Sequence, residues 1–448
     1  MKKTALAFAM TSAMLVIPVY AADPAATPAP PQLPEFLTPA TLETLKQASQ
    51  ELTAATGSER NVAKIWEKYA NFEFSPALRP KLKEMFGAER PFPITRTDGP
   101  KGQINYIGKL APYLYVQGNG TDFNWSEMTL KLSTEKTGRS MTMDMQWPSL
   151  VMARSDFSVS MENMTLVAKQ QRAADGVDYG VANFGVELVS ARDVTVGDKA
   201  AEKPLRFEGI TARSETSRRG NNVEIAYRST VKAMVMGDER VDHANFAFRL
   251  TNVPVKVMAD FSRSMREQNA QKLDPKAQQE LMLKNMKDLG KRALQSGAVL
   301  LIDDISAGYR GNVAAIKGRV SFAKTVDADF QDIKAIMKKI VAHFEVRVPV
   351  ALIRDVGRAI SARSVDASAA DAARQIDAGA DAIVSFVVGK AVSSGFAVVE
   401  KDELRSTIDI KDDKLSINGK SMELPKNLGI KAAPEAKPAP APETKPTP

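Results

Sequence analysis

Phe246-Ala-Phe-Arg-Leu250 and Phe344-Glu-Val-Arg-Val348 each alternate apolar and polar residues with the period of a β-strand. Each run leads to a Val-Pro pair, at Val253-Pro254 in the first case and at Val348-Pro349 in the second. Beyond both prolines the apolar residues recur at helical spacing, and a polar helix follows. The same succession of patterns therefore occurs twice in the C-terminal half of the chain.

The second half of each segment also matches. A Ser-Gly break at Ser296-Gly297 or at Ser394-Gly395 ends the polar helix, and an apolar strand and a closing hairpin follow. We interpret residues 245–324 and 343–424 as two copies of one repeat unit. This repeat is an architectural signal, and it contains no chemistry of its own.

Residues 104–244 keep the strand period throughout. Turn residues such as Gly118-Asn119-Gly120 and Asp175-Gly176 separate the runs at hairpin spacing, which leaves no room for parallel crossovers. We therefore predict an α+β fold. Its centre is an elongated, twisted, mainly antiparallel sheet, a hairpin meander, with flanking amphipathic helices and the internally duplicated C-terminal half.

The N-terminal region predicts export. Residues 1–21 have the two lysines, the apolar run and the small residues of a cleavable signal peptide, and residues 22–37 form a Pro/Ala-rich leader. The alternative is an uncleaved segment that anchors the chain to the inner membrane. Amphipathic helices are expected over residues 38–87, the second starting at Ser58, and residues 425–448 form a Pro/Ala/Lys-rich disordered tail.

The composition limits the chemistry. The 448 residues are 44% hydrophobic and 25% charged, which is ordinary for a folded chain, and there is no cysteine for a disulfide, a thiolate nucleophile or a sulfur-ligated metal. The net charge of +8 comes from lysines and arginines that are spread singly, without a basic run or stacking aromatics. We therefore expect no nucleic-acid partner, and no later segment reads as a transmembrane span.

A search for catalytic or metal-binding patterns gives no site. The two histidines, His243 and His343, have no further ligand at metal spacing, and the acid pairs Asp303-Asp304 and Asp412-Asp413 read as strand-end and turn residues. No nucleophile elbow or phosphate-binding loop is present. We assign no catalytic residue, no metal and no cofactor, and we expect a protein that is not an enzyme.

Methionines gather in one part of the predicted sheet. Met141, Met143, Met145 and Trp147 alternate with polar residues, so they share one face of a strand. Thioether side chains form an apolar surface that adapts to varied ligands. Two interpretations remain open, because this face is either core beneath the N-terminal helices or a surface for a hydrophobic ligand.

The second repeat carries a family resemblance. Val348-Pro349-Val350, the polar helix through Asp371-Ala-Ala-Arg-Gln375, the break at Gly395 and the ending Leu415-Ser-Ile-Asn-Gly-Lys-Ser-Met422 resemble the YdgA-like envelope proteins of Gram-negative bacteria, a family of uncharacterised function. The resemblance implies an envelope location and a β-rich repetitive fold, and it brings no catalytic residues. Family members usually retain the N-terminal apolar segment as an anchor, whereas here it looks cleavable. In pattern only, the chain also resembles AsmA-type proteins, whose long sheets form apolar grooves for lipid.

These observations predict an exported, periplasmic protein that binds lipid or another hydrophobic ligand along an apolar sheet face. The alternative is a protein-interaction scaffold without a small ligand, in which another envelope protein covers that face. An enzyme without a recognisable motif ranks third.

Overall fold

The computed structural model describes residues 36–56, 59, 61–193, 204–237, 239–270, 275–366 and 368–422. The predicted signal peptide, nearly all of the leader and the C-terminal tail lie outside these residues. The described chain is an α+β structure built on one antiparallel sheet.

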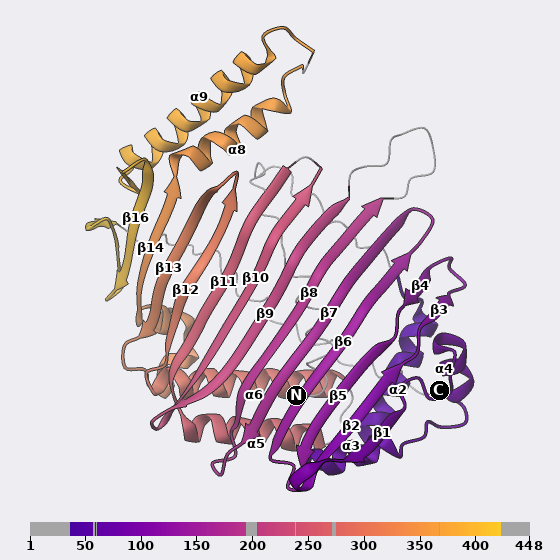
Figure 1. The fold of residues 1–448 in the computed structure, drawn as a ribbon. Helices are drawn as coiled ribbons and strands as arrows, with labels where there is room; N and C mark the ends of the chain where they lie inside the picture. The colour runs from indigo at the N-terminus through magenta and orange to yellow at the C-terminus, as the bar shows by residue number, and fades with distance from the viewer. Residues whose placement is uncertain are drawn as a thin grey trace, which may run out of the picture.

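The sheet is long, twisted and open, as predicted (Figure 1). From β5 to β14 each strand pairs with the next one along the chain, and β2 and β1 continue the sheet beyond β5. The strands before the first repeat are β1 (Ile94–Asp98), β2 (Gln103–Leu110), β3 (Tyr113–Val116), β4 (Asp122–Trp125), β5 (Met128–Glu135), β6 (Ser140–Ala153), β7 (Phe157–Arg172), β8 (Asp178–Asp193), β9 (Leu205–Arg219) and β10 (Asn222–Met236). The remaining strands are β11 (Glu239–Pro254), β12 (Val299–Tyr309), β13 (Asn312–Phe322), β14 (Ile340–Pro349), β15 (Val398–Glu400), β16 (Glu403–Lys411), β17 (Lys414–Ile417) and β18 (Lys420–Met422).

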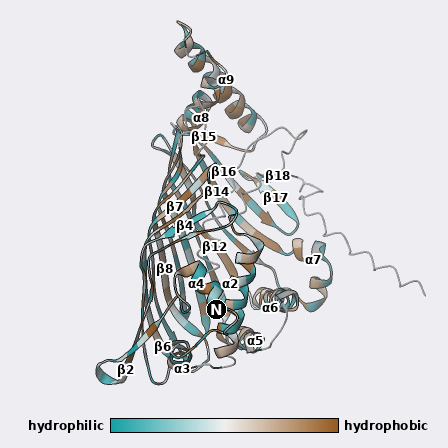
Figure 2. Ribbon diagram, turned by 90° about the vertical axis from the view of Figure 1, so that its right-hand side faces the viewer, coloured by the Kyte–Doolittle hydropathy of each residue, from teal (hydrophilic) through white to brown (hydrophobic). Residues whose placement is uncertain are grey.

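Most helices lie on the concave side of the curved sheet (Figure 2). The N-terminal group and the first repeat's helices both pack there, and the second repeat's helices stand clear of it. The helices are α2 (Pro39–Thr56), α3 (Val62–Ala70), α4 (Arg79–Phe86), α5 (Val255–Ala270), α6 (Pro275–Gln295), α7 (Ile333–Met337), α8 (Val350–Ala362) and α9 (Ala372–Ser393), with short 3₁₀ turns η1 (Pro100–Gly102) and η2 (Asp327–Gln331).

The N-terminal helices differ from the sequence prediction at one boundary. The second helix, α3, begins at Val62 and not near Ser58, because the side chain of Asn61 caps it by accepting a hydrogen bond from the Lys64 N–H at 3.2 Å. Helix α4 ends at Gly87, whose φ of 76° is the left-handed conformation that glycine adopts without strain.

The two predicted repeat segments share one order of elements. Strand, helix, helix, strand and strand follow one another as β11-α5-α6-β12-β13 and as β14-α8-α9-β16-β17. In each, the strand before the helices pairs antiparallel with a strand after them. The closing hairpins also match, since Arg310-Gly311 and Asp412-Asp413 both have positive φ, as type I′ turns require. Strand β11 crosses the predicted boundary at residue 244, so the β body and the repeats form one continuous sheet.

The second segment contains an additional short strand. β15 pairs only with the start of β16, and the turn between them, at Lys401-Asp402, also has two positive φ angles.

The helical hairpins of the two segments emerge at opposite ends of the sheet (Figure 1). Three antiparallel steps separate β11 from β14, so the two strands run in opposite directions. β11 therefore delivers the chain to one end of the sheet, where α5 begins, and β14 delivers it to the other end, where α8 begins.

Candidate functional site

The inner, concave face of the sheet is apolar over most of its width. Because side chains alternate along a strand, residues that pair across strands continue on the same face. One continuous row of paired residues crosses eleven strands from β5 to β16. This row is Leu130, Met145, Leu166, Phe184, Ala212, Ser229, Phe246, Ile305, Ile316, Val346 and Ser406.

A second row lies beside the first, one step nearer to α5. It contains Leu132, Met143, Ala168, Ala182, Ser214, Tyr227, Phe248, Ile302, Gly318, Phe344, Ile408 and Ile417. We call these two rows together the inner apolar face.

Helices cover only parts of this face. On the N-terminal side, Met141 and Met143 pack with Trp66 of α3. At the α5 end, Val223 and Val253 are fully buried with Val257 of α5. Between and beyond these covered parts none of the described helices covers the face, and Phe246 and Ile316 are 53% and 36% exposed. Large apolar side chains on the inside of a curved sheet are thus left accessible to solvent.

The middle of the inner apolar face carries small side chains. Ala182 of β8, Ala212 and Ser214 of β9 and Ser229 of β10 lie between larger residues on both sides. Phe184 flanks them on one side and belongs to the cluster beneath the N-terminal segment. These small residues form the floor of the inner apolar face at its middle.

Aromatic rings form the other side of this floor. The rings of Tyr227 and Phe248 lie 5.2 Å apart, tilted by 30°. The ring of Phe344 lies over Gly318 on the neighbouring strand. A Cβ added to Gly318 would lie 2.5 Å from this ring, so the glycine is needed for this ring position. The open part of the inner face therefore has ordered aromatic side chains.

The four candidate residues from the sequence lie on this face, but not all in its open part. Met141 and Met143 pack beneath α3, and Trp147 belongs to the cluster beneath Phe36 and Leu37. The Trp147 indole N–H is buried and has no acceptor among the described residues. Met145 is in the first row beside Leu130 and Leu166, and it is partly exposed.

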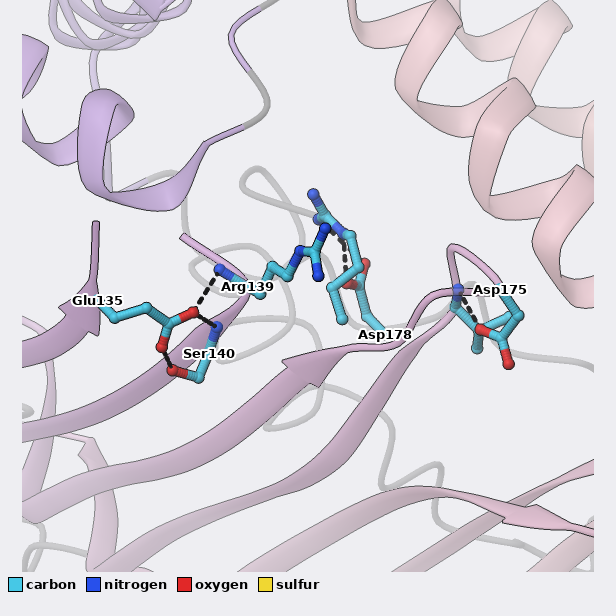
Figure 3. A network of polar contacts seen from close by, with 7 residues as sticks. Glu135, Arg139, Ser140, Asp175 and Asp178 are labelled. Carbon is cyan, nitrogen blue, oxygen red and sulfur yellow. Dashed lines mark hydrogen bonds and ion pairs between the residues drawn. The ribbon is translucent and has the colours of Figure 1, made fainter. Parts of the chain in front are cut away.

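Polar contacts gather at the strand ends between α3 and the α5–α6 pair (Figure 3). Glu135, at the end of β5, accepts hydrogen bonds from the hydroxyls of Ser140 and Thr137 and from the backbone N–H groups of Arg139 and Ser140. Burial raises the pKa of Glu135, but these hydrogen bonds outweigh it and lower the pKa to about 2. The carboxylate therefore stays ionised and holds the β5–β6 turn.

The neighbouring turn is fixed in the same way. Arg172 and Asp178 form an ion pair with Nε and Oδ1 2.8 Å apart. The carboxylate of Asp175 accepts hydrogen bonds from the Val177 N–H and from the Tyr179 hydroxyl, each at 3.0 Å. Burial, followed by the bond to Asp175, raises the pKa of Tyr179 to about 12. These groups satisfy one another, so they form a polar border to the inner apolar face and not a reactive cluster.

The histidines and acid pairs are not brought together. His243 sits at an irregularity of β11 with φ of 56°, and His343 lies three strands away on β14. His343 Nδ1 is 2.8 Å from Asp409 Oδ1, a bond that raises the pKa of the imidazole. Asp303 is held by two hydrogen bonds of 2.7 Å from Arg249. Among the described residues no cluster of three or more histidines and acids could hold a metal.

The outer face carries a shallow hollow of about 510 Å³ near the middle of the sheet. Four of its five charged lining residues pair with one another, Arg249 with Asp303 and Arg213 with Glu215 at 2.9 Å, and the fifth is Arg228. Because most of these charges are already compensated, the hollow is a weaker candidate than the inner apolar face.

Only part of the site could be predicted from the sequence. Phe246, Phe248 and Phe344 begin the repeat motif, and their alternation placed them on one face. Nothing in the pattern indicated that helices would leave this part open, since α8 and α9 occupy the same place in the second segment as α5 and α6 in the first. The small residues Ala212 and Ser214 carry no motif at all.

The fold and the candidate site together define the class of protein. It is an α+β protein with one open, curved antiparallel sheet, and its helices cover part of the apolar inner face of this sheet. The chain belongs to a bacterial family described as "bacterial protein of unknown function (DUF945)", whose model matches residues 68–425. Neither a curated protein nor a solved structure matches the chain. In the part of the chain that the structure describes, the helices are too short or too polar to span a membrane.

Proposed function

We propose that this protein is a non-enzymatic binder of an elongated apolar ligand, the acyl chain of a lipid, on the open part of the inner apolar face. The observation that carries the proposal is the exposed phenylalanine Phe246, which lies on the inside of a curved sheet between Ser229 and Ile305, in a row of mostly apolar side chains. Water does not favour a broad apolar surface in this position, and surfaces of this kind mark binding sites.

The dimensions support an extended ligand. Neighbouring strands lie about 4.8 Å apart, so the open stretch from Ala212 on β9 to Val346 on β14 spans roughly 24 Å. Each buried methylene group contributes about 0.8 kcal/mol, so a long chain gains affinity without any specific polar contact. The paired aliphatic residues provide no charge pattern that selects one headgroup.

The location proposed from the sequence is consistent with this role. The family match makes the finer YdgA-like resemblance a reasonable proposal, and with it an exported envelope protein. Cleavage after Ala21 would yield a mature chain that begins at Ala22, and intact-mass measurement of the exported protein tests this directly. Retention of residues 1–21 would favour the membrane-anchored alternative.

The binding test compares one residue on each face of the sheet. Phe246→Asp places a carboxylate in the open inner face, where water can reach it, so the fold should persist while bound lipid is lost. Val167→Asp is the matched control, because Val167 is 48% exposed and its neighbours Leu166 and Ala168 are the residues that point inward. Lipid extraction and mass spectrometry of wild type and both variants give the readout.

The proposal predicts lipid in wild type and in Val167→Asp, and a strong reduction in Phe246→Asp at an unchanged thermal midpoint. A wild-type protein that carries no lipid and takes up none from added vesicles would contradict it. If wild type instead forms a complex of two chains that Phe246→Asp dissociates, the scaffold alternative is correct.

A further inference from the structure

The α8–α9 hairpin exposes an apolar surface at the end of the molecule opposite α5 and α6 (Figure 2). Its residues lie on the second half of α9, on the turn that follows it and on β15, and we call them the α9 surface. The exposed residues are Phe386 (72%), Val392 (44%), Phe396 (49%) and Val399 (50%).

The two helices of the hairpin contact each other directly. Gly357 of α8 lies so close to α9 that an added Cβ would be 3.2 Å from the Ala380 Cα. Arg354 and Arg358 form ion pairs of 2.9 Å with Asp381 and Asp377 across the two helices. The α9 surface therefore points outward from a rigid support.

The α9 surface has the chemistry of a bilayer contact. Residues 382–399 contain a single charged residue, Lys390, and the side chain of Lys420 lies next to Gly395 at the base of the hairpin. A membrane-surface segment combines aromatic and aliphatic side chains with lysines that reach the headgroups. A protein partner would more often be matched by a polar rim with paired hydrogen-bonding groups, which this stretch does not offer.

The α9 surface is continuous with the inner apolar face. Val348 of β14 pairs with Leu404 of β16, and Leu404 pairs with Val399 of β15. Paired residues share a face, so the apolar lining extends from the inside of the sheet to the exposed hairpin. An acyl chain could pass along this route without crossing a charged surface.

The N-terminal end of the described chain lies at the same end of the sheet. The ring of Phe36 packs against Phe157 at 5.8 Å, and Phe157 begins β7. β7 runs in the same direction as β11, so it starts at the end where β14 finishes and α8 begins. The 35 residues before Phe36, with their apolar run, thus join the described chain at the end that carries the α9 surface.

We propose that the α9 surface docks the protein on a lipid bilayer, with Phe386 and Phe396 inserted at the headgroup boundary. The inference rests on the proposed function, because it names the bilayer as the source of the ligand on the inner apolar face.

The test uses the complete chain and the absence of cysteine in it. Val392→Cys carries an environment-sensitive dye on the α9 surface, and Met282→Cys carries it on α6 at the opposite end, where Met282 is similarly exposed at 48%. Vesicles of phosphatidylethanolamine and phosphatidylglycerol should shift the emission of the dye at position 392 to shorter wavelength and shield it from an aqueous quencher. The dye at position 282 should not respond, even if the N-terminal segment also binds the vesicles.

Phe386→Ser combined with Phe396→Ser should weaken the vesicle response at position 392 by about tenfold or more, because two aromatic side chains no longer insert. An unchanged response in this variant, or an aqueous dye at position 392 in wild type, overturns the inference. A shift that appears without vesicles and follows a doubling of mass would identify a second copy of the chain as the occupant, and would also overturn it.

Lipid content separates this inference from the proposed function. The Phe386→Ser/Phe396→Ser variant should still take up a fatty acid that is added free in solution, since its inner apolar face is intact. Lipid-free wild type would contradict the proposed function, whereas a normal lipid content together with an unresponsive α9 surface would contradict the docking inference alone.

Discussion

The helical hairpins α5–α6 and α8–α9 occupy corresponding places in two segments of similar sequence, yet their surroundings differ. Val257 and Met258 of α5 are buried against Val253 of the sheet. On α8, the residues Val356 and Ile360 are 42% and 51% exposed. The difference arises because the two hairpins leave the sheet at opposite ends. One end offers a sheet surface to pack against, and at the other the hairpin extends into solvent.

This comparison shows that position in a repeat does not determine burial. The same order of elements can give a helical hairpin that packs on the sheet in one copy and a hairpin with an exposed surface in the other. We therefore expect substitutions at corresponding positions of the two segments to have unequal effects.

The largest difference is expected at the Val-Pro pairs. Val253→Asp would bury a carboxylate at a site with no exposed surface, and should lower the free energy of unfolding by about 3–5 kcal/mol. Val348→Asp, at the partly exposed corresponding position, should cost only about 1–2 kcal/mol. Urea denaturation of both variants measures the difference, and equal losses would show that the two strand ends are equally buried.

Gly357→Leu tests whether α8 and α9 are held mainly by each other. The new side chain cannot fit at the helix crossing, so the hairpin should lose about 1–3 kcal/mol of local stability while the sheet is unaffected. Hydrogen exchange should accelerate in α8 and α9 only. Gly389→Leu is the control on the same hairpin, because no atom lies near its added Cβ. Faster exchange throughout the sheet would mean that the hairpin supports the whole fold.

The cross-strand ion pair of the first segment should weaken in acid. The hydrogen bond from Arg249 lowers the pKa of Asp303, so its contribution is present above the unfolded pKa, about 3.9, and is lost as pH falls through the folded value. Because the pair is partly exposed, Asp303→Asn should cost about 1 kcal/mol at pH 7. Urea midpoints of wild type and variant should approach each other as the pH falls below about 3.9, and a constant difference would exclude titration of Asp303 as its cause.

The histidine–carboxylate pair of the second segment should show the opposite pH dependence, and its effect on the free energy of unfolding should be the smallest. The hydrogen bond from Asp409 raises the pKa of His343, so this contribution is present below the unfolded pKa, about 6.5, and is lost as pH rises through the folded value. His343→Gln should cost about 0.5 kcal/mol or less at pH 5, since both side chains are about half exposed. A double-mutant cycle with Asp409→Asn between pH 5 and 9 tests this, and coupling that grows with pH would reverse the assignment.

The sheet could be predicted from the sequence because alternation is a local property. The runs around Met141 and Phe246 identified strands, and Asp412-Asp413 identified a turn. The start of α3 was wrong because Asn61, not Ser58, provides the capping oxygen. Cap choice depends on which side chain reaches the backbone, and sequence spacing alone leaves both open.

The candidate site was predicted only as a face. Alternation placed Met141, Met143, Met145 and Trp147 together, but coverage depends on where helices dock after the chain has folded. Three of these residues proved to pack beneath the N-terminal segment, whereas Phe246, part of the repeat motif, is open. A pattern with period two specifies on which face of the sheet a residue lies, and it does not specify which parts of that face the helices cover.

The short strands at the margins of the sheet have a consequence for solubility. An open sheet has two edges with unpaired backbone groups, which can template aggregation with other chains. Here β1 has five residues, and β17 and β18 have four and three. Exposed Arg96, Lys414 and Lys420 lie on them. A second molecule that added its own strand would gain few backbone hydrogen bonds and would bring like charges together, so a sheet of this width can remain dispersed at high concentration.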